Sequence, residues 1–155
     1  MQSPSMRAII QRVTEASVSI AGELHAEIDR GLLVLLGVEQ ADEVEDRDWL
    51  AAKIAQMRIF SDADGKMNRN ISEVGGALLV VSQFTLYAST KKGNRPSFLR
   101  AAHPSMAEPM YESFCQQLSL LSGTIVKKGV FGAEMHIRLC NDGPVTIAMD
   151  SRDKQ

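Results

Sequence analysis

Apolar and polar residues alternate along much of the first part of the chain, in the stretch RAIIQRVTEASVSIAGELHAEI that begins at Arg7. Alternation of this kind is typical of a β-strand with one buried face. Ala21 and Gly22 interrupt the pattern and suit a two-residue connection between strands. The pattern therefore predicts an antiparallel pair of strands near Ser17–Ile20 and Glu23–Ile28.

Two later stretches are apolar without alternation. Gly31–Val38 (GLLVLLGV) fits either a strand buried on both faces or a short buried helix, and its valines and flanking glycines favour the strand. The second stretch, ALLVVSQFTLY from Ala77 to Tyr87, is interpreted as another largely apolar strand. Between these stretches, FSDADGKMN predicts a polar turn at Asp64–Gly65.

Helical spacing of apolar residues predicts two helices. The first spans Asp42 to about Arg58, with acidic residues near its N-terminal end, where the helix dipole favours negative charge. The second begins near Pro104, because Ser105 and Glu108 fit an S-x-x-E capping box, and it ends near Ser122–Gly123. The apolar positions are Val44, Trp49, Leu50, Ile54 and Met57 in the first helix and Met110, Phe114, Leu118 and Leu121 in the second.

The order of these elements predicts the fold class. Three strands, a helix, a strand, a helix and then two or three short strands indicate an α+β fold, with a mainly antiparallel, barrel-like sheet and two helices packed outside it. We expect a single domain over residues 6–150, preceded by a disordered extension at residues 1–5 and followed by a polar tail at residues 151–155.

Composition narrows the range of functions. The formal net charge is −2, so any contact with nucleic acid depends on a local basic patch. Cys115 and Cys140 are too few for a disulfide framework, and neither they nor the three scattered histidines have metal-ligand spacing, so we expect no metal and no cofactor. The start lacks an apolar signal core, and the longest apolar run is far shorter than the roughly 20 residues of a membrane span. We therefore expect a cytoplasmic protein.

One loop concentrates positive charge. Lys91, Lys92 and Arg95 lie in STKKGNRPSF, directly after the second apolar stretch. Read alone, this loop favours an ordinary solvated surface, and it also fits a patch that follows a phosphate backbone without reading bases.

The stretch SQFTLY, from Ser82 to Tyr87, places polar residues at the end of an apolar strand. It fits a strand leaving the core, and it also fits a strand end that aims backbone N–H groups and a hydroxyl at an oxyanion. The chain has no G-x-S-x-G motif, and no histidine lies in a context that predicts a catalytic triad.

A second unusual stretch is NDGPVT, from Asn141 to Thr146, between two segments that read as strands. Its residues suit a turn, but Pro144 removes a backbone donor where strand pairing should restart. Gly143–Pro144 is therefore either a turn or a rigid backbone surface presented to something else.

Taken together, SQFTLY and NDGPVT resemble motifs of the D-aminoacyl-tRNA deacylases of the DTD type. The intervening stretches QRV, GLLVLLGV, RIFSDADGKMN and NRPSF support the resemblance, which runs in order from Met6 to about Met149. The family hydrolyses the ester that joins a D-amino acid to the 3′-terminal adenosine of tRNA. The resemblance implies this activity for the chain, with possible action on glycyl-tRNA. It also implies a homodimer that acts on aminoacyl-tRNA and has neither DNA nor a membrane as a partner.

The resemblance also implies roles for particular residues. Gly143–Pro144 would form a cis peptide that enters the partner's active site and excludes L substrates, and Arg12 would fix the orientation of its carbonyl groups. The catalytic residues would be Ser82, Gln83, Phe84 and Thr85, with backbone N–H groups near the last two stabilising the oxyanion.

Two alternatives stay open. Thr85 could act as a nucleophile, although no base to activate its hydroxyl is visible in the sequence. The chain could also be a non-catalytic, β-rich interaction module, in which SQFTLY is only a core exit and NDGP a plain surface turn.

Overall fold

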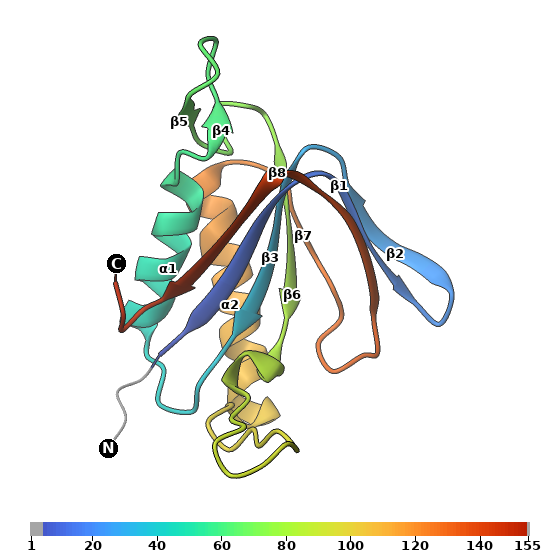
Figure 1. Cartoon of the computed structure of the whole chain (residues 1–155), viewed down its shortest axis with the longest axis vertical. Coiled ribbons are helices and arrows are strands. Elements are labelled where there is room, and N and C mark those ends of the chain that lie inside the picture. Colours follow the sequence, from blue (N-terminus) through green and yellow to red (C-terminus); the bar gives the residue numbers. More distant parts are fainter. Residues whose placement is uncertain (1–4, 155) are drawn as a thin grey trace.

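The computed structural model describes residues 5–154 of the chain. Its elements are strands of very unequal length, two α-helices and one 3₁₀ helix (Figure 1). In chain order they are β1 (Arg7–Ile20), β2 (Glu23–Ile28), β3 (Gly31–Gly37), α1 (Val44–Gln56), β4 (Phe60–Ser61), β5 (Met67–Arg69), β6 (Ala77–Ser82), η1 (Phe84–Tyr87), α2 (Pro104–Ser122), β7 (Val126–Lys128) and β8 (His136–Asp150).

The long strand β1 organises the main sheet. Along its whole length β1 pairs with β8 on one edge, while its other edge pairs first with β3 and then with β2. β6 and β7 extend the sheet from β3 in parallel. The far edges approach each other, because Lys127 Nζ donates to the Glu27 carbonyl oxygen over 2.7 Å. The nearly closed, mostly antiparallel sheet with two helices outside it confirms the predicted fold class (Figure 1).

Both faces of the central strands are buried. Leu32, Val34 and Leu36 of β3 belong to the core that faces α1 and α2. Leu33 and Leu79 point to the opposite face, into a second core enclosed by the curled sheet. Burial on both faces explains why β3 and β6 are apolar without alternation, and it confirms the strand interpretation.

The start of α2 agrees with the prediction, whereas the start of α1 does not. α1 starts at Val44 rather than Asp42. α2 starts at Pro104, but its N-cap is His103, whose Nδ1 accepts a hydrogen bond from the Ser105 N–H over 3.2 Å. The predicted capping box of Ser105 and Glu108 is wrong, because Ser105 already lies inside the first turn. The predicted end is confirmed, since Gly123 adopts a left-handed conformation with φ of 64°.

Two predicted strand boundaries are also wrong. The strand expected to continue to Tyr87 ends at Ser82, and Phe84–Tyr87 forms the 3₁₀ helix η1. NDGPVT is not a turn between two strands, because β8 continues through it. The extra residues are accommodated as a bulge against β1.

Both ends of the described chain pack against the domain. Residues 1–4 of the expected extension lie outside the described residues, whereas Ser5 is buried. Ser151, expected in the polar tail, is also buried; its Oγ accepts the Met6 N–H over 3.0 Å and donates to Asp46 Oδ1 over 2.7 Å. The packed structure therefore includes one residue beyond each expected boundary.

Candidate active site

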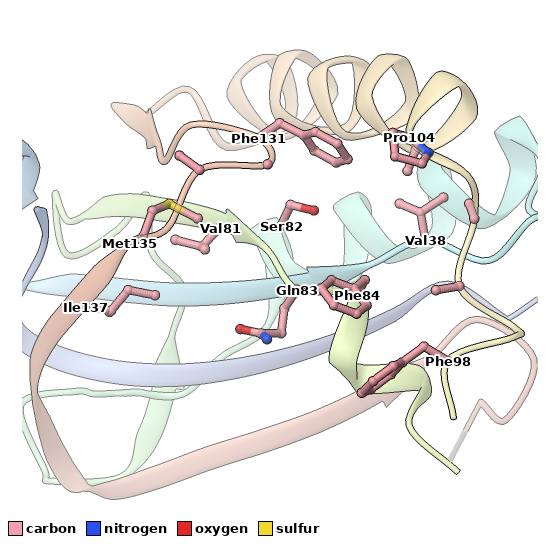
Figure 2. Close-up of a pocket in the computed structure, with 15 residues that line it drawn as sticks. Val38, Val81, Ser82, Gln83, Phe84, Phe98, Pro104, Phe131, Met135 and Ile137 are labelled. Carbon is pink, nitrogen blue, oxygen red and sulfur yellow. The ribbon is translucent and has the colours of Figure 1, made fainter. Parts of the chain in front are cut away.

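A pocket of about 580 Å³ opens where four parts of the chain meet: the end of β6, η1, the start of α2 and the connection from β7 to β8 (Figure 2). Most of the lining is apolar, with a few polar groups on one wall, as is usual for small-molecule sites. The lining residues are Val38, Val81, Ser82, Gln83, Phe84, Phe98, Ala101, Ala102, Pro104, Ala107, Phe131, Gly132, Ala133, Met135 and Ile137.

Three of the four predicted catalytic residues line this pocket. Figure 2 shows the Ser82 side chain directed into the cavity, with Gln83 and Phe84 following along the wall. Thr85 is exposed and does not line the pocket, but its hydroxyl accepts a short hydrogen bond from Gln83 Nε2. The motif thus supplies one hydroxyl, one amide and one aromatic ring to the wall.

The backbone of the motif presents two N–H groups at the start of η1. The Gln83 N–H donates to the Leu36 carbonyl over 2.8 Å, which ties the end of β6 to β3. Phe84 and Thr85 open the 3₁₀ helix, whose internal bonds begin with the Leu86 N–H. The first N–H groups of a helix have no acceptor within it, so those of Phe84 and Thr85 can serve a ligand oxygen.

Aromatic side chains frame the pocket mouth. The Phe84 ring is 57% exposed and meets Phe98 edge to face, with 5.1 Å between ring centroids. Phe131 lies across the cavity from this pair (Figure 2). Exposed aromatic faces can stack on a nucleobase. Sequence reasoning missed Phe98 and Phe131, because only the tertiary fold brings these distant loops to the motif.

Gly143 and Pro144 form an exposed bulge in β8. Gln11 pairs with Thr146 and Val13 pairs with Asn141, so the four residues 142–145 stand opposite Arg12 alone. The Gly143–Pro144 peptide is cis, as the resemblance implies.

Arg12 holds the base of this bulge. Its Nε donates to the Asp142 carbonyl over 2.9 Å, and its Nη1 donates to the Ile59 carbonyl over 2.7 Å. Asn141 Oδ1 accepts the Val145 N–H over 2.8 Å on the other side. The acceptor of Arg12 is thus the carbonyl just before Gly143, and the bulge is fixed from both flanks.

The bulge and the pocket do not meet within one chain. β8 contributes Ile137 to the pocket, but no residue of 141–146 lines it. In Figure 1, β8 bends over the upper end of the sheet, whereas the yellow-green helical turn after β6 lies at the lower end. A single chain therefore leaves the exposed Gly143–Pro144 bulge away from its own pocket.

The basic loop begins beside the pocket wall. Ser89 and Ser97 exchange two backbone hydrogen bonds of 2.8 Å, which close the loop, and Phe98 follows at the pocket. Lys91, Lys92 and Arg95 are all exposed on the loop. Positive charge is thus available next to the pocket mouth.

A group of buried carboxylates, Glu39, Asp42 and Asp46, lies near Tyr87, the last residue of η1. Glu39 is paired with Arg100, with two N–O distances of 3.1 Å. Asp42 is 6% exposed and has a pKa of about 7; burial raises it most, and the Asp46 and Glu39 carboxylates add to the effect. Asp42 is therefore a buried acid that titrates near neutral pH.

We expect this acid to make stability depend on pH. Between the ordinary pKa of 3.8 and about 7, folded Asp42 keeps a proton that the unfolded chain has lost. The free energy of unfolding should therefore fall as pH rises through this window and level off above it. Melting temperatures at pH 5 and pH 8 should differ less in Asp42→Asn than in the wild type. Asp48→Asn removes a carboxylate of α1 whose side chain is 46% exposed and pairs with Arg47, and it should keep the wild-type difference. An Asp42→Asn variant with that full difference would contradict the assignment.

Among residues 5–154, no cluster of three or more His, Cys, Asp or Glu side chains is placed to hold a metal ion. Within the same residues, no helix is long and apolar enough to cross a lipid bilayer.

Comparison with known proteins places the chain in a family. The sequence model of the D-Tyr-tRNA(Tyr) deacylase family matches residues 9–150. D-aminoacyl-tRNA deacylases from Cytophaga hutchinsonii and Parabacteroides distasonis are 59% and 56% identical over 150 residues, which cover 97% of this chain and 100% of each relative.

Two solved structures share the fold of this chain. The c-Myc DNA unwinding element binding protein is 40% identical, with a TM-score of 0.86 over 92% of this chain and 97% of that one. A probable eukaryotic D-amino acid tRNA deacylase is 17% identical and shares the fold, with a TM-score of 0.79 over 94% and 99% of the two chains. The family match, the close relatives and the position of Ser82–Phe84 in the pocket wall lead to one conclusion: this chain belongs to the D-Tyr-tRNA(Tyr) deacylase family.

Proposed function

We propose that this protein hydrolyses the ester bond of D-aminoacyl-tRNA in the cytoplasm, releasing a D-amino acid and tRNA. The observation that carries the proposal is the pocket wall formed by Ser82, Gln83 and Phe84, where the first two N–H groups of η1 have no backbone acceptor among the described residues. A carbonyl oxygen that becomes negative during ester hydrolysis needs such donors, because they are oriented before the reaction begins.

The remaining pocket suits the end of a tRNA. The exposed Phe84 ring and the half-buried Phe98 ring beside it offer a stacking surface for the terminal adenine. With the ester held at the N–H groups of Phe84 and Thr85, the attacking water would lie beside the ribose 2′-hydroxyl. Positioning of this kind can supply much of the rate for an activated ester.

We further propose that the active enzyme is a homodimer in which each subunit places Gly143–Pro144 in the partner's pocket. The separation of bulge and pocket within one chain supports this arrangement, as does the exposure of the bulge. Among the described residues β8 pairs only with β1, so its outer edge is available to a second copy.

Chirality would be read by backbone rather than by side-chain fit. Carbonyl oxygens at Gly143–Pro144, held in place by Arg12 through Asp142, would accept hydrogen bonds from the substrate α-amine. The same backbone would occupy the space that an L side chain needs. This is selection by exclusion, and it is independent of which D-amino acid is attached.

The proposal is tested by incubating the protein with D-Tyr-tRNA and L-Tyr-tRNA and following the loss of charged tRNA. We expect rapid loss of the D form and persistence of the L form. If both remain charged, the chain is not a deacylase under these conditions and the non-catalytic interaction module is favoured instead. Glycyl-tRNA, which has no side chain to exclude, should also be hydrolysed.

The role of Thr85 can be separated from that of the backbone. Because its hydroxyl is exposed and accepts from Gln83 rather than donating to a base, we expect Thr85→Ala to keep much of the rate and all of the preference for the D form. Removing a true nucleophile should instead cost on the order of 10⁴-fold in kcat. Single-turnover kinetics on D-Tyr-tRNA distinguish the two outcomes.

Neutralising Lys91, Lys92 and Arg95 should weaken tRNA binding. We expect glutamine at all three positions to raise the KM for D-aminoacyl-tRNA and to flatten its dependence on salt, because each lost phosphate contact reduces that slope by about 0.7–0.9. A minimal D-aminoacyl-adenosine substrate lacks the tRNA backbone, so its kinetics should not change.

A matched control removes three exposed cations elsewhere, at Lys53, Arg58 and Lys66. This variant should keep the wild-type salt dependence. Equal loss of activity on both substrates in the loop variant would show that the loop shapes the pocket instead of binding RNA.

A further inference from the structure

The buried side of η1 is held by a tyrosine that has no part in the pocket. Tyr87, the last residue of η1, is 2% exposed. Its hydroxyl lies 2.8 Å from the Gly37 carbonyl oxygen and also within hydrogen-bonding distance of the Ser5 carbonyl oxygen. Burial, followed by the Asp42 and Glu39 carboxylates, raises the pKa of Tyr87 far above its ordinary value, so the hydroxyl remains a donor at every working pH.

Arg7 holds the same end of η1 from the first residue of β1. Its Nη1 donates to the Leu86 carbonyl over 3.0 Å, and its Nε donates to Asp150 Oδ2 over 3.2 Å. The guanidinium also lies 5.0 Å from the centre of the Tyr87 ring. A cation at the C-terminal carbonyls of a helix satisfies their free acceptors and complements the helix dipole.

The contact between η1 and β3 leaves little room for movement. A Cβ added at Gly37 would lie only 2.8 Å from a ring carbon of Tyr87 and 3.2 Å from Leu86 Cβ, so the backbone of β3 touches the helical turn directly. One residue earlier, the Leu36 carbonyl accepts the Gln83 N–H. The turn is therefore fixed to β3 at its start and at its end.

We propose that Tyr87 and Arg7 are positioning residues for the reaction: they hold η1 so that the N–H groups of Phe84 and Thr85 point at the developing oxyanion. The inference rests on the proposed deacylase function and deepens it. Neither side chain lines the pocket, so neither touches a substrate bound there. A shift of η1 would misdirect the donors, and small displacements of reacting groups have large effects on rate.

The test is Tyr87→Phe, which removes the hydroxyl and keeps the ring beside Arg7. On D-Tyr-tRNA we expect kcat to fall by at least about tenfold, with KM and the preference for the D form unchanged. Tyr111→Phe is the matched control, because Tyr111 is 1% exposed and its hydroxyl also donates to a backbone carbonyl, that of Val80, over 2.7 Å. The control should lose comparable thermal stability but keep kcat.

A second variant makes the test independent of folding of the first. Arg7→Lys keeps the charge but cannot bridge Leu86 and Asp150 as the guanidinium does, and it should show the same fall in kcat at constant KM. The proposal is overturned if folded Tyr87→Phe or Arg7→Lys keeps the wild-type kcat, or if Tyr111→Phe loses as much. A wild-type protein that hydrolyses neither substrate would instead defeat the proposed function itself.

Discussion

Replacing Gly143 with alanine should lower kcat/KM for D-aminoacyl-tRNA by on the order of 10²-fold, because reactions of this kind lose about that much when a contact is displaced by 1 Å. The backbone at Gly143 has φ of +137°, which side-chain-bearing residues rarely adopt. The new Cβ would lie 2.8 Å from Val145 Cγ2 and 3.1 Å from Arg12 Nη2, so the bulge must move. Steady-state kinetics on D-Tyr-tRNA and L-Tyr-tRNA measure the effect.

Gly22→Ala is the matched control for this variant. Gly22 also has a positive φ, of +81°, but nothing lies within 4 Å of the Cβ it would gain, and it sits in the turn between β1 and β2. This variant should lose some stability and keep full activity. Wild-type rates and wild-type rejection of the L form in folded Gly143→Ala would show that the bulge does not select substrates.

Filling the pocket should have an effect at least as large. Ala133 lines the cavity and is only partly buried, so a tryptophan ring there can extend into the pocket without disturbing the main core. We expect Ala133→Trp to lose on the order of 10²-fold or more in kcat/KM for D-Tyr-tRNA, because the terminal adenosine can no longer reach its productive position.

The neighbouring residue offers the control for the added ring. Glu134 is exposed and does not line the pocket, although Ala133 and Met135 on either side of it do. Glu134→Trp should therefore keep nearly full activity. If Ala133→Trp is as active as Glu134→Trp, the substrate does not occupy this cavity.

The strands were predictable where burial dictates the residue types. The apolar runs of β3 and β6 follow from burial on both faces, and the Ala21–Gly22 connection follows from local turn preferences. The two helices were predictable from the spacing of apolar residues such as Leu50 and Phe114. These features depend on short-range sequence patterns, which is why they can be read from one chain.

The 3₁₀ turn and the bulge could not be predicted, because contacts between residues far apart in the sequence hold them in place. Leu86 and Tyr87 look like the continuation of an apolar strand, but contacts with Arg7, Gly37 and Ser5 hold them in a 3₁₀ turn. The bulge at Gly143–Pro144 depends in the same way on a distant residue, because Arg12 of β1 donates to the Asp142 carbonyl.

Only part of the candidate site could be predicted, because some of its residues come together only through contacts between distant parts of the chain. SQFT stood out because polar residues end an apolar strand, and the position of Ser82, Gln83 and Phe84 in a pocket wall agrees with that interpretation. Phe98, Ala133 and Met135 carry no local signal of function. They reach the pocket only because α2 and the connection before β8 fold over the end of β6.

The activity of a mixed dimer tests most directly whether the partner's bulge completes each active site. One subunit carries Gly143→Ala and the other carries Ala133→Trp; the two are co-expressed with different tags, and the species bearing both tags is purified. Each homodimer of a single variant is expected to be nearly inactive. In the mixed dimer, the intact pocket of the first subunit faces the intact bulge of the second.

We expect this mixed dimer to regain about half of the wild-type rate on D-Tyr-tRNA, since one of its two symmetric sites is whole. If bulge and pocket of the same chain worked together, both sites would be defective. A purified mixed dimer as inactive as its two parents, or failure of the two tagged chains to associate while the wild type remains active, would show that the partner's bulge does not complete the site.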